Sequence, residues 1–425
     1  MTSRLDEWLG RIEQRHSSSI ELGLERCAAV WARMGRPRPA RHLISVAGTN
    51  GKGSTVAGIE AAFRFLGRRV GSYTSPHLVR YSERIRIGGD EAGDEVIIDG
   101  FEAVEAAAGD TRLTYFEFAT LAALATLSRA TLDFAVLEIG LGGRLDAVNV
   151  LDADVAVITP IGLDHQEYLG NDRDSVGREK AGILRAGQTV VCSDRDPPDS
   201  VYLAADRLDA RLIRIGADFD ISHDRDAHAE PLWRYFFADL EAAMPIAMAG
   251  AHQADNLAGA LTAVLVSAPE SRARLDELAV AVAGSRLRGR LERVSDDPEI
   301  IVDVGHNPLA AMVIADFLDG RGGKPCLGVL GMLHDKDAEG VAKHLGDRVS
   351  AWYCGGLLGP RGQTGEDLAL RVRAALPQAA VGAYPTVATA LDAAIDDVGQ
   401  GGLVLVFGSF HTAGEAITHV ERRNC

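Results

Sequence analysis

In the first half of the chain, short apolar runs alternate with segments whose apolar residues recur every three to four positions. The runs at residues 42–47, 134–139 and 155–159 consist mainly of Val, Ile, Leu and Ala, which is typical of parallel strands buried on both faces. Residues 54–66 and 116–128 follow a 3.6-residue period and predict helices between these strands. This alternation predicts an α/β domain in which right-handed crossovers join the parallel strands.

A second series of strands and helices follows a basic, glycine-containing stretch at residues 285–290. Its predicted strands are 300–304, 326–330, 351–354 and 403–407, and its predicted helices are 309–318 and 387–397. We therefore expect a first domain at residues 1–287 and a smaller, Rossmann-like α/β domain at residues 288–425. Residues 218–245 carry mixed signals and predict a β-hairpin or a loop.

Composition narrows the class of protein. A length of 425 residues exceeds what one hydrophobic core usually serves, and a net charge of −16 argues against a nucleic-acid partner. Residues 1–8 lack the apolar run of a signal peptide, and no apolar stretch approaches the roughly 20 residues of a membrane span. The five cysteines are widely spaced and form no Cys-x-x-Cys pair. We expect a cytoplasmic protein with reduced thiols and no nucleic-acid or membrane partner.

A glycine-rich loop joins the first predicted strand to the first predicted helix, which is the context that a phosphate-binding loop requires. Backbone N–H groups, the helix N-terminus and a lysine there can hold triphosphate oxygens, and a hydroxyl can bind Mg²⁺. The predicted ATP-binding residues of this loop are Gly48, Thr49, Asn50, Gly51, Lys52, Gly53, Ser54 and Thr55. The loop departs from the common pattern twice, because Val46 replaces the first glycine and Gly53 separates Lys52 from the hydroxyl residue.

Together with the loop, four further segments resemble the Mur ligase and folylpolyglutamate synthase superfamily of ATP-dependent ligases. These segments are Thr-Ser-Pro-His-Leu with Glu-Arg-Ile at 74–85, Glu-Ile-Gly-Leu-Gly-Gly-Arg-Leu-Asp-Ala-Val-Asn at 138–149, Asp-His at 164–165 and Glu-Lys-Ala-Gly-Ile at 179–183. Similarity to the family's motifs runs from about residue 20 to about residue 412, nearly the whole chain. It implies a P-loop-containing, Mur-ligase-like N-terminal domain ahead of the smaller C-terminal domain.

The resemblance assigns roles to residues around the loop. It implies magnesium ligation by Ser75, Glu138 and His165, and Ser54 is the loop hydroxyl that we expect to join them. A carboxylate such as Glu138 at the end of a parallel strand suits Mg²⁺, which prefers oxygen ligands. The family's lysine that matches Lys180 is carbamylated, which requires a neutral amine. The predicted catalytic residues are Lys52, Glu138, His165 and Lys180.

The resemblance also implies contacts to nucleotide and substrate. In the bifunctional bacterial members, residues matching the segments at 20–26, 114–118 and 145–147 contact a pteroate. The nucleotide residues that it adds to the loop are Asn256, Arg290, Asp303 and His306. The predicted substrate-binding residues are Ile20, Glu21, Leu22, Gly23, Arg80, Thr114, Phe116, Leu145, Asp146 and Ala147.

The implied reaction is ATP-dependent ligation of L-glutamate to 7,8-dihydropteroate, and of further glutamates to reduced folates, through an acyl phosphate. It implies ATP as cosubstrate and two Mg²⁺ sites, and we expect a monomer. A synthase that acts on preformed folates only remains an alternative. A peptidoglycan-building ligase would need a nucleotide-sugar domain of about 100 residues ahead of the loop, more than the residues before Gly48 offer. A P-loop regulator is the non-enzymatic alternative, and no feature marks the switch segment that it would need.

Overall fold

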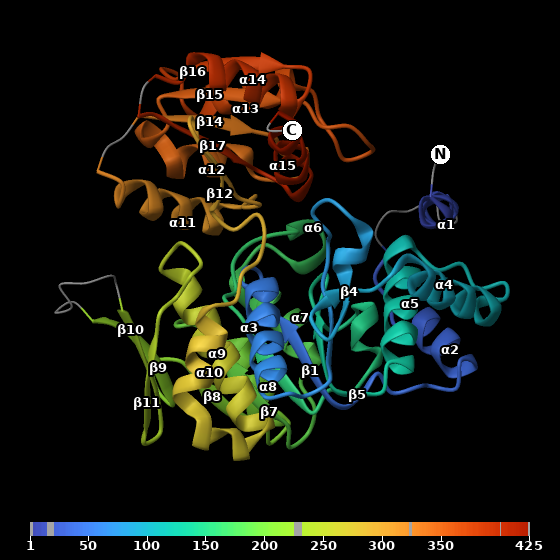
Figure 1. Cartoon of the computed structure of the whole chain (residues 1–425). Helices are drawn as coiled ribbons and strands as arrows, with labels where there is room; N and C mark the ends of the chain where they lie inside the picture. Colours follow the sequence, from blue (N-terminus) through green and yellow to red (C-terminus); the bar gives the residue numbers. More distant parts are fainter. Residues whose placement is uncertain (1–2, 15–20, 225–231, 323–324, 400, 424–425) are drawn as a thin grey trace. The chain divides into compact units, whose positions relative to one another are not determined.

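The computed structural model describes residues 3–14, 21–224, 232–322, 325–399 and 401–423, which cluster into two compact units (Figure 1). The first unit contains Met1–Ile161, Asn171–Ala247 and Ala254–Arg286. The second unit contains Gly162–Gly170, Met248–Gln253 and Leu287–Cys425. Two short segments that lie inside the predicted first domain therefore cluster with the second unit, which a division at a single point along the sequence does not anticipate.

An eight-stranded sheet forms the centre of the first unit. Its strands are β1 (Ala40–Ala47), β2 (Val70–Tyr73), β3 (Ile85–Ile87), β4 (Asp90–Glu91), β5 (Leu132–Glu138), β6 (Val155–Ile158), β7 (Thr189–Cys192) and β8 (Arg211–Arg214). Their order is β4-β3-β2-β5-β1-β6-β7-β8, and only β3 and β4 pair antiparallel to their neighbours. The predicted strands at 42–47, 134–139 and 155–159 are the adjacent parallel strands β1, β5 and β6, which confirms the α/β class.

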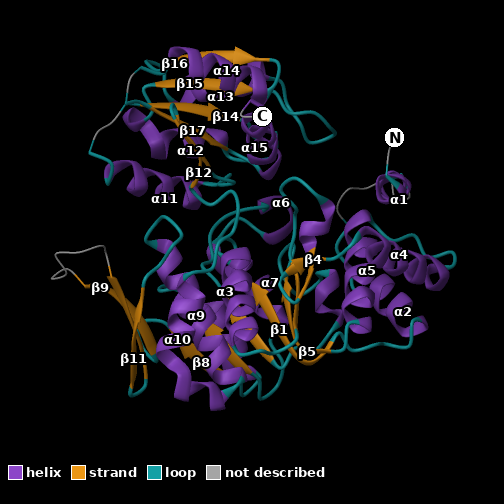
Figure 2. Cartoon of the chain, viewed as in Figure 1, coloured by secondary structure: helices purple, strands orange, loops and turns teal. Residues whose placement is uncertain are grey.

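Helices flank this sheet (Figure 2), and α3 packs against α10 while α4 packs against α5. The helices up to residue 283 are α1 (Arg4–Glu13), α2 (Glu25–Arg33), α3 (Lys52–Phe65), α4 (Asp94–Ala108), α5 (Tyr115–Arg129), α6 (Gln166–Leu169), α7 (Arg173–Lys180), α8 (Asp199–Arg207), α9 (His252–Ser267) and α10 (Leu275–Ala283). Of these, α6 lies in the segment that clusters with the second unit. Short 3₁₀ turns are η1 (Tyr81–Arg84), η2 (Ala147–Val150), η3 (Ala181–Ile183) and η4 (Pro269–Arg274). Helix α5 begins at a capping box in which Thr114 and Glu117 satisfy each other's backbone N–H groups.

The region with mixed sequence signals contains an antiparallel sheet of β9 (Phe219–Asp224), β10 (Leu232–Phe237) and β11 (Leu240–Met244). The hairpin expectation is therefore correct for β10 and β11, and β9 adds a third strand on the other side of β10. Tyr235 is fully buried and exchanges a hydrogen bond of 2.8 Å with Thr262 of α9, which attaches this sheet to the first unit.

The second unit is also α/β. Its sheet has the order β12-β13-β17-β14-β15-β16, in which only β12 runs antiparallel. The strands are β12 (Glu292–Asp296), β13 (Glu299–Val302), β14 (Cys326–Leu330), β15 (Ala351–Gly355), β16 (Ala380–Tyr384) and β17 (Leu403–Phe407), and the helices are α11 (Pro308–Asp319), α12 (Ala338–Leu345), α13 (Gly365–Ala375), α14 (Val387–Asp397) and α15 (Phe410–Arg423), with a 3₁₀ turn η5 (Gly346–Arg348). Trp352 and Phe407 belong to its buried core.

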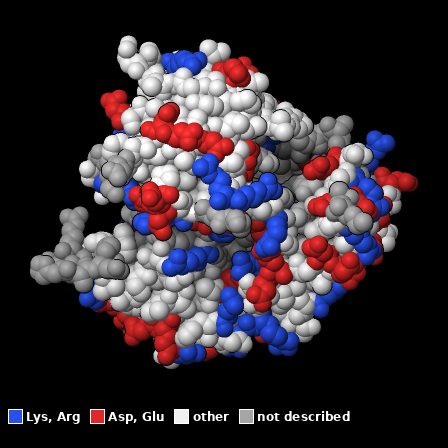
Figure 3. All heavy atoms as spheres, turned by 45° about the horizontal axis from the view of Figure 1, so that its top comes forward, with Lys and Arg blue, Asp and Glu red and all other residues white. Residues whose placement is uncertain are grey.

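Two surface properties bear on partners. No helix within the described parts of the chain is both long enough and apolar enough to cross a membrane. On the face shown in Figure 3, acidic and basic side chains both occur and many lie close to one another.

Candidate functional site

The carboxyl edge of the first-unit sheet brings several predicted site residues together. Strand β1 ends at Ala47, directly before the glycine-rich loop, and its Val46 is the register partner of Glu138 at the end of β5. Because both strands are parallel and adjacent, the loop and Glu138 meet at the same edge of the sheet. Ligands of open α/β sheets bind at this edge, where successive connections leave in opposite directions.

The loop itself depends on two glycines. Gly51 has a φ of 90°, and a Cβ at this position would lie 2.1 Å from Oδ1 of Asn256. A Cβ on Gly48 would lie 1.8 Å from Oγ1 of Thr159, which follows β6 and donates to the carbonyl of Asn50 at 2.7 Å. Both positions therefore exclude any larger side chain. The contact with Asn256 also places one predicted nucleotide residue of α9 directly beside the loop.

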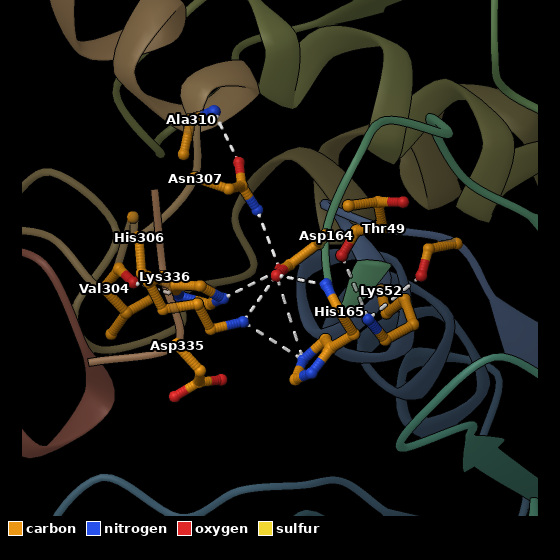
Figure 4. Close-up of polar contacts among 12 residues, drawn as sticks. Thr49, Lys52, Asp164, His165, Val304, His306, Asn307, Ala310, Asp335 and Lys336 are labelled. Carbon is orange, nitrogen blue, oxygen red and sulfur yellow. Dashed lines mark hydrogen bonds and ion pairs between the residues drawn. The ribbon is translucent and has the colours of Figure 1, made fainter. Parts of the chain in front are cut away.

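The hydrogen bonding of two polar side chains of the loop, Ser54 and Lys52, bears on what the loop can bind. The hydroxyl of Ser54 is buried and has no hydrogen-bond partner among the described residues. Lys52 Nζ donates to the carbonyl oxygens of Gly48 and Thr49 at 3.2 and 3.1 Å (Figure 4). An orphaned buried oxygen fits a cation ligand, because a buried hydroxyl without a partner is otherwise costly.

Three further predicted residues lie around this loop. The backbone N–H of Ser75 donates to Oε2 of Glu138 at 3.2 Å. Lys180, at the end of α7, is 3% exposed, and its Nζ donates to the carbonyl of Gly48 at 2.7 Å. The first unit thus brings the loop, Ser75, Glu138 and Lys180 together from segments far apart in the sequence.

His165 belongs to a segment of the second unit, where Asp164 is the centre of a polar cluster (Figure 4). The carboxylate of Asp164 accepts from Lys336 Nζ at 2.5 Å, His306 Nε2 at 3.1 Å and Asn307 Nδ2 at 3.2 Å. Lys336 Nζ also lies 3.1 Å from Nε2 of His165. The cluster therefore links the 162–170 segment to two loops of the C-terminal sheet.

Charges in this cluster shift its pKa values strongly. Burial raises the pKa of Asp164, but the hydrogen bond from His306 and the charges of His306 and Lys336 hold it well below its usual range. Burial lowers the pKa of His165 to about 4, and Lys336 and His306 add to the effect while Asp164 opposes it. His165 is therefore neutral above about pH 5, the state in which imidazole can bind a metal.

The other predicted nucleotide residues of the second unit lie near the end of β13. Asp303 accepts backbone N–H bonds from Leu291 at 2.9 Å and from Gly305 at 2.6 Å. Burial raises the pKa of Asp303, while the charge of Arg290 and these N–H groups oppose the rise. The guanidinium of Arg290 lies 5.3 Å from the centre of the Phe410 ring. Asp303, Arg290 and His306 are thus neighbours on this unit.

The predicted substrate residues lie where α2, α5 and η2 meet. The ring of Phe116 covers Gly140, where a Cβ would lie 2.4 Å from Cζ of the ring. Asp146 accepts from the N–H groups of Leu141 and Val148 at 2.8 and 2.9 Å. The neighbouring predicted residues on these elements and on the loop before α2 are Glu21, Leu22, Gly23, Thr114, Leu145 and Ala147. Arg80 is exposed and pairs with Glu91 at 2.9 Å, and Ile20 lies outside the described residues.

No three His, Cys, Asp or Glu side chains among the residues that the structure describes form a metal-binding group. The predicted ligand set of Ser54, Ser75, Glu138 and His165 does not require one, because two of its four members are hydroxyl side chains. The hydroxyls and the carboxylate of this predicted set match the preference of Mg²⁺ for oxygen ligands, and the imidazole of His165 is its one nitrogen ligand.

Several charged residues of the candidate site were not predicted from the sequence. Arg26 donates to the carboxylate of Glu117 through Nε at 3.2 Å and through Nη2 at 2.9 Å, and its Nη1 donates to Glu21. Lys336 and Asp164 are 172 residues apart in the chain. In sequence, each of these charges resembles a solvated surface residue. The family motifs that contain them were the only available signal.

Comparison with known proteins identifies the family. The Mur ligase middle domain matches residues 46–264, and the Mur ligase glutamate ligase domain matches residues 289–410. The dihydrofolate synthase/folylpolyglutamate synthase of Escherichia coli K12 is 41% identical over 431 residues, which covers 99% of this chain and 96% of that protein.

Solved structures agree with this sequence similarity. E. coli FolC in complex with DHPP and ADP has a TM-score of 0.92 at 40% identity, covering 100% of this chain and 99% of that chain. A bifunctional folylpolyglutamate synthase/dihydrofolate synthase with Mn, AMPPNP and L-glutamate bound has a TM-score of 0.88 at 39% identity, covering 99% of this chain and 98% of that chain. The chain therefore belongs to the Mur ligase family and, within it, to the dihydrofolate synthase/folylpolyglutamate synthases.

Proposed function

We propose that this protein uses ATP to ligate L-glutamate to 7,8-dihydropteroate, giving dihydrofolate, and adds further glutamates to reduced folates. The acceptor carboxylate attacks the γ-phosphate of ATP and forms an acyl phosphate and ADP. The amine of glutamate then attacks the acyl carbon, and phosphate leaves as the amide forms. The names of the relatives and the assembly of the loop, Ser75, Glu138 and Lys180 at one sheet edge support this proposal.

The observation that carries the proposal is the arrangement around the glycine-rich loop. The N–H groups at the start of α3 and the ammonium of Lys52 supply positive charge for triphosphate oxygens. Lys52 now donates to two carbonyl oxygens of its own loop, and phosphate oxygens are stronger acceptors for the same group. The residues from Gly48 to Thr55 therefore form the proposed triphosphate site.

Ser54, Ser75, Glu138 and His165 are the proposed residues for two Mg²⁺ ions. Bound magnesium would neutralise the charge that develops on the transferred phosphoryl group. The orphaned hydroxyl of Ser54 and the low exposure of Glu138, 6%, support this assignment. Glu138 already receives the N–H of Ser75, so the backbone of the 74–85 loop holds its carboxylate in place.

Lys180 is proposed to carry a carbamate. A neutral amine at Nζ would add to carbon dioxide, form the N–C bond and release one proton, which leaves an anion. The nearly complete burial of Lys180 beside the carbonyl of Gly48 supports a role at the loop rather than on the surface. An anion there would help to orient a cation near the γ-phosphate.

The remaining proposed contacts concern nucleotide and acceptor. Asn256, Arg290, Asp303 and His306 are proposed to hold the nucleotide, as the family resemblance implies. For the acceptor, the ring of Phe116 offers a flat face to a pterin, and Asp146 offers a carboxyl for its amino groups. Both residues lie on elements that pack together, which supports a common binding surface for the pterin.

The decisive experiment measures glutamate ligation and ADP release with dihydropteroate and with a reduced folate in parallel. We expect both acceptors to support turnover that requires ATP and glutamate. Glu138→Gln should abolish both activities, whereas Glu95→Gln, at a side chain that is 71% exposed, should leave both unchanged. Turnover with a preformed folate only would remove the first activity from the proposal. Absence of turnover with either acceptor would refute it.

A further inference from the structure

Arg84 is a buried cation without an anionic partner. It ends the η1 turn, is only 7% exposed, and forms no ion pair with a carboxylate of the described residues. By contrast, the exposed Arg69 pairs with Asp133 at 3.1 Å. Burying an uncompensated guanidinium costs several kcal/mol, so buried arginines are normally paired. The missing anion is therefore the feature to explain.

The neighbours of Arg84 are polar or aromatic, but neutral. Its Nε donates to Nδ1 of His77 at 2.8 Å, which assigns the ring proton of His77 to Nε2. Its guanidinium carbon lies 5.2 Å from the ring centre of Tyr81 and 5.7 Å from that of Tyr115. Cation–π contacts orient a guanidinium and stabilise it partly, but they do not neutralise it.

The position of Arg84 connects the two ends of the proposed acceptor site. His77 lies two residues after Ser75, whose N–H binds the proposed metal ligand Glu138. On the other side, Tyr115 is the first residue of α5 and adjoins Phe116, the proposed pterin contact. Arg84 thus contacts both the loop at the phosphate end and the helix start at the pterin end.

We infer that Arg84 binds the carboxylate of the acceptor, the group that the proposed reaction activates. This inference rests on the proposed function, which requires an anionic acceptor whose carboxylate lies close to the triphosphate. A guanidinium presents several N–H donors in one plane and matches a carboxylate with two hydrogen bonds. Nε is occupied by His77 and the guanidinium also interacts with the hydroxyl of Tyr73, so the remaining N–H groups of the two terminal nitrogens are the donors for the acceptor. The bound carboxylate supplies the negative charge beside Arg84 that no carboxylate of the described residues supplies.

The test compares two ligands that differ only in this charge, dihydropteroate and its carboxamide, in equilibrium binding without ATP. The wild-type protein should bind the acid about ten- to a hundredfold more tightly than the amide, as expected of a charge-assisted pair. Arg84→Met should bind the acid as weakly as the amide, with the affinity for the amide nearly unchanged. Arg84→Lys should recover part of the preference. Arg69→Met, at an exposed arginine, is the control that should keep it.

Three results would overturn the inference, and they can be told apart. If Arg84→Met weakens both ligands equally, while the wild-type protein ligates glutamate to dihydropteroate, Arg84 supports the fold of the site and does not bind the carboxylate. If the wild-type protein binds the acid and the amide equally, no residue recognises the charge of the acceptor carboxylate. If the folded wild-type protein binds neither ligand, the proposed function fails together with this inference. If Arg84→Met unfolds, it loses amide binding as well. In that case the preference of Arg84→Lys for the acid over the amide decides whether Arg84 binds the carboxylate.

Discussion

The carboxyl of Asp146 should remain protonated well above the pH at which an exposed aspartate ionises. Its side chain is 2% exposed, and burial raises the pKa of Asp146 to about 6. Backbone N–H groups of Leu141, Val148 and Gly140 and the charge of Lys52 oppose this rise without cancelling it. The folded protein therefore binds this proton more tightly than the unfolded chain does.

The magnitude follows from the difference between the two pKa values. A rise of about 2 units corresponds to ~3 kcal/mol of unfolding free energy at 1.36 kcal/mol per unit. The sign is that of an acid whose folded pKa is raised. Its contribution is fully present below about pH 4 and is lost as the pH rises through about 6. Asp146→Asn has no proton to lose, so it should gain stability relative to the wild-type protein by this amount between pH 4 and pH 7.

Thermal unfolding of both proteins at pH 4 and pH 7 measures this change. At roughly 2–4 °C per kcal/mol, the difference in Tm for the first unit should change by about 6–12 °C in favour of Asp146→Asn. The amide oxygen of Asp146→Asn accepts hydrogen bonds more weakly than a carboxylate does. This loss of stability is the same at both pH values, so it cancels in the comparison. Asp133→Asn is the control, since a hydrogen bond from Arg69 lowers the pKa of Asp133. A Tm difference that is the same at both pH values would show that Asp146 is already ionised at pH 4.

Three further variants test other contacts. Gly140→Ala should displace the Phe116 ring and raise KM for dihydropteroate by about tenfold, as expected for overpacking, with KM for ATP unchanged. An unchanged KM for dihydropteroate would show that this ring does not contact the pterin. Arg26→Met should leave the carboxylate of Glu117 unpaired, and a double-mutant cycle with Glu117→Gln should give a coupling of about 1–3 kcal/mol; additive effects would contradict this pairing. Lys336→Met should destabilise the second unit by about 3–5 kcal/mol, because the buried carboxylate of Asp164 loses its counter-charge. Calorimetry with Lys336→Arg as the comparison measures this, and an unchanged Tm would mean that solvent already screens the Lys336–Asp164 pair.

Much of the fold could be predicted because its signals are local. The strand, glycine-rich loop and helix that run from β1 into α3 are contiguous, so their apolar pattern and glycines carry the prediction. The buried strands β5 and β6 have apolar side chains on both faces and stand out in the same way. The small sheet β9–β11 gave mixed signals, since β10 alternates buried and exposed residues only in part. The edge strands β3 and β4 are only three and two residues long and were not predicted.

In the candidate site, too, the features with a local signal could be predicted from the sequence and the others could not. The sequence by itself determined the glycine-rich loop that is proposed to bind phosphate, because its glycines, lysine and hydroxyls are neighbours in the chain, and the family motifs marked Glu138, His165 and Lys180. Only the tertiary structure decided that the segment containing His165 clusters with the second unit and that Arg84 is buried without a carboxylate. Burial and pairing of a charge depend on side chains that folding brings from distant segments, such as Tyr115 beside Arg84, and no local pattern encodes them.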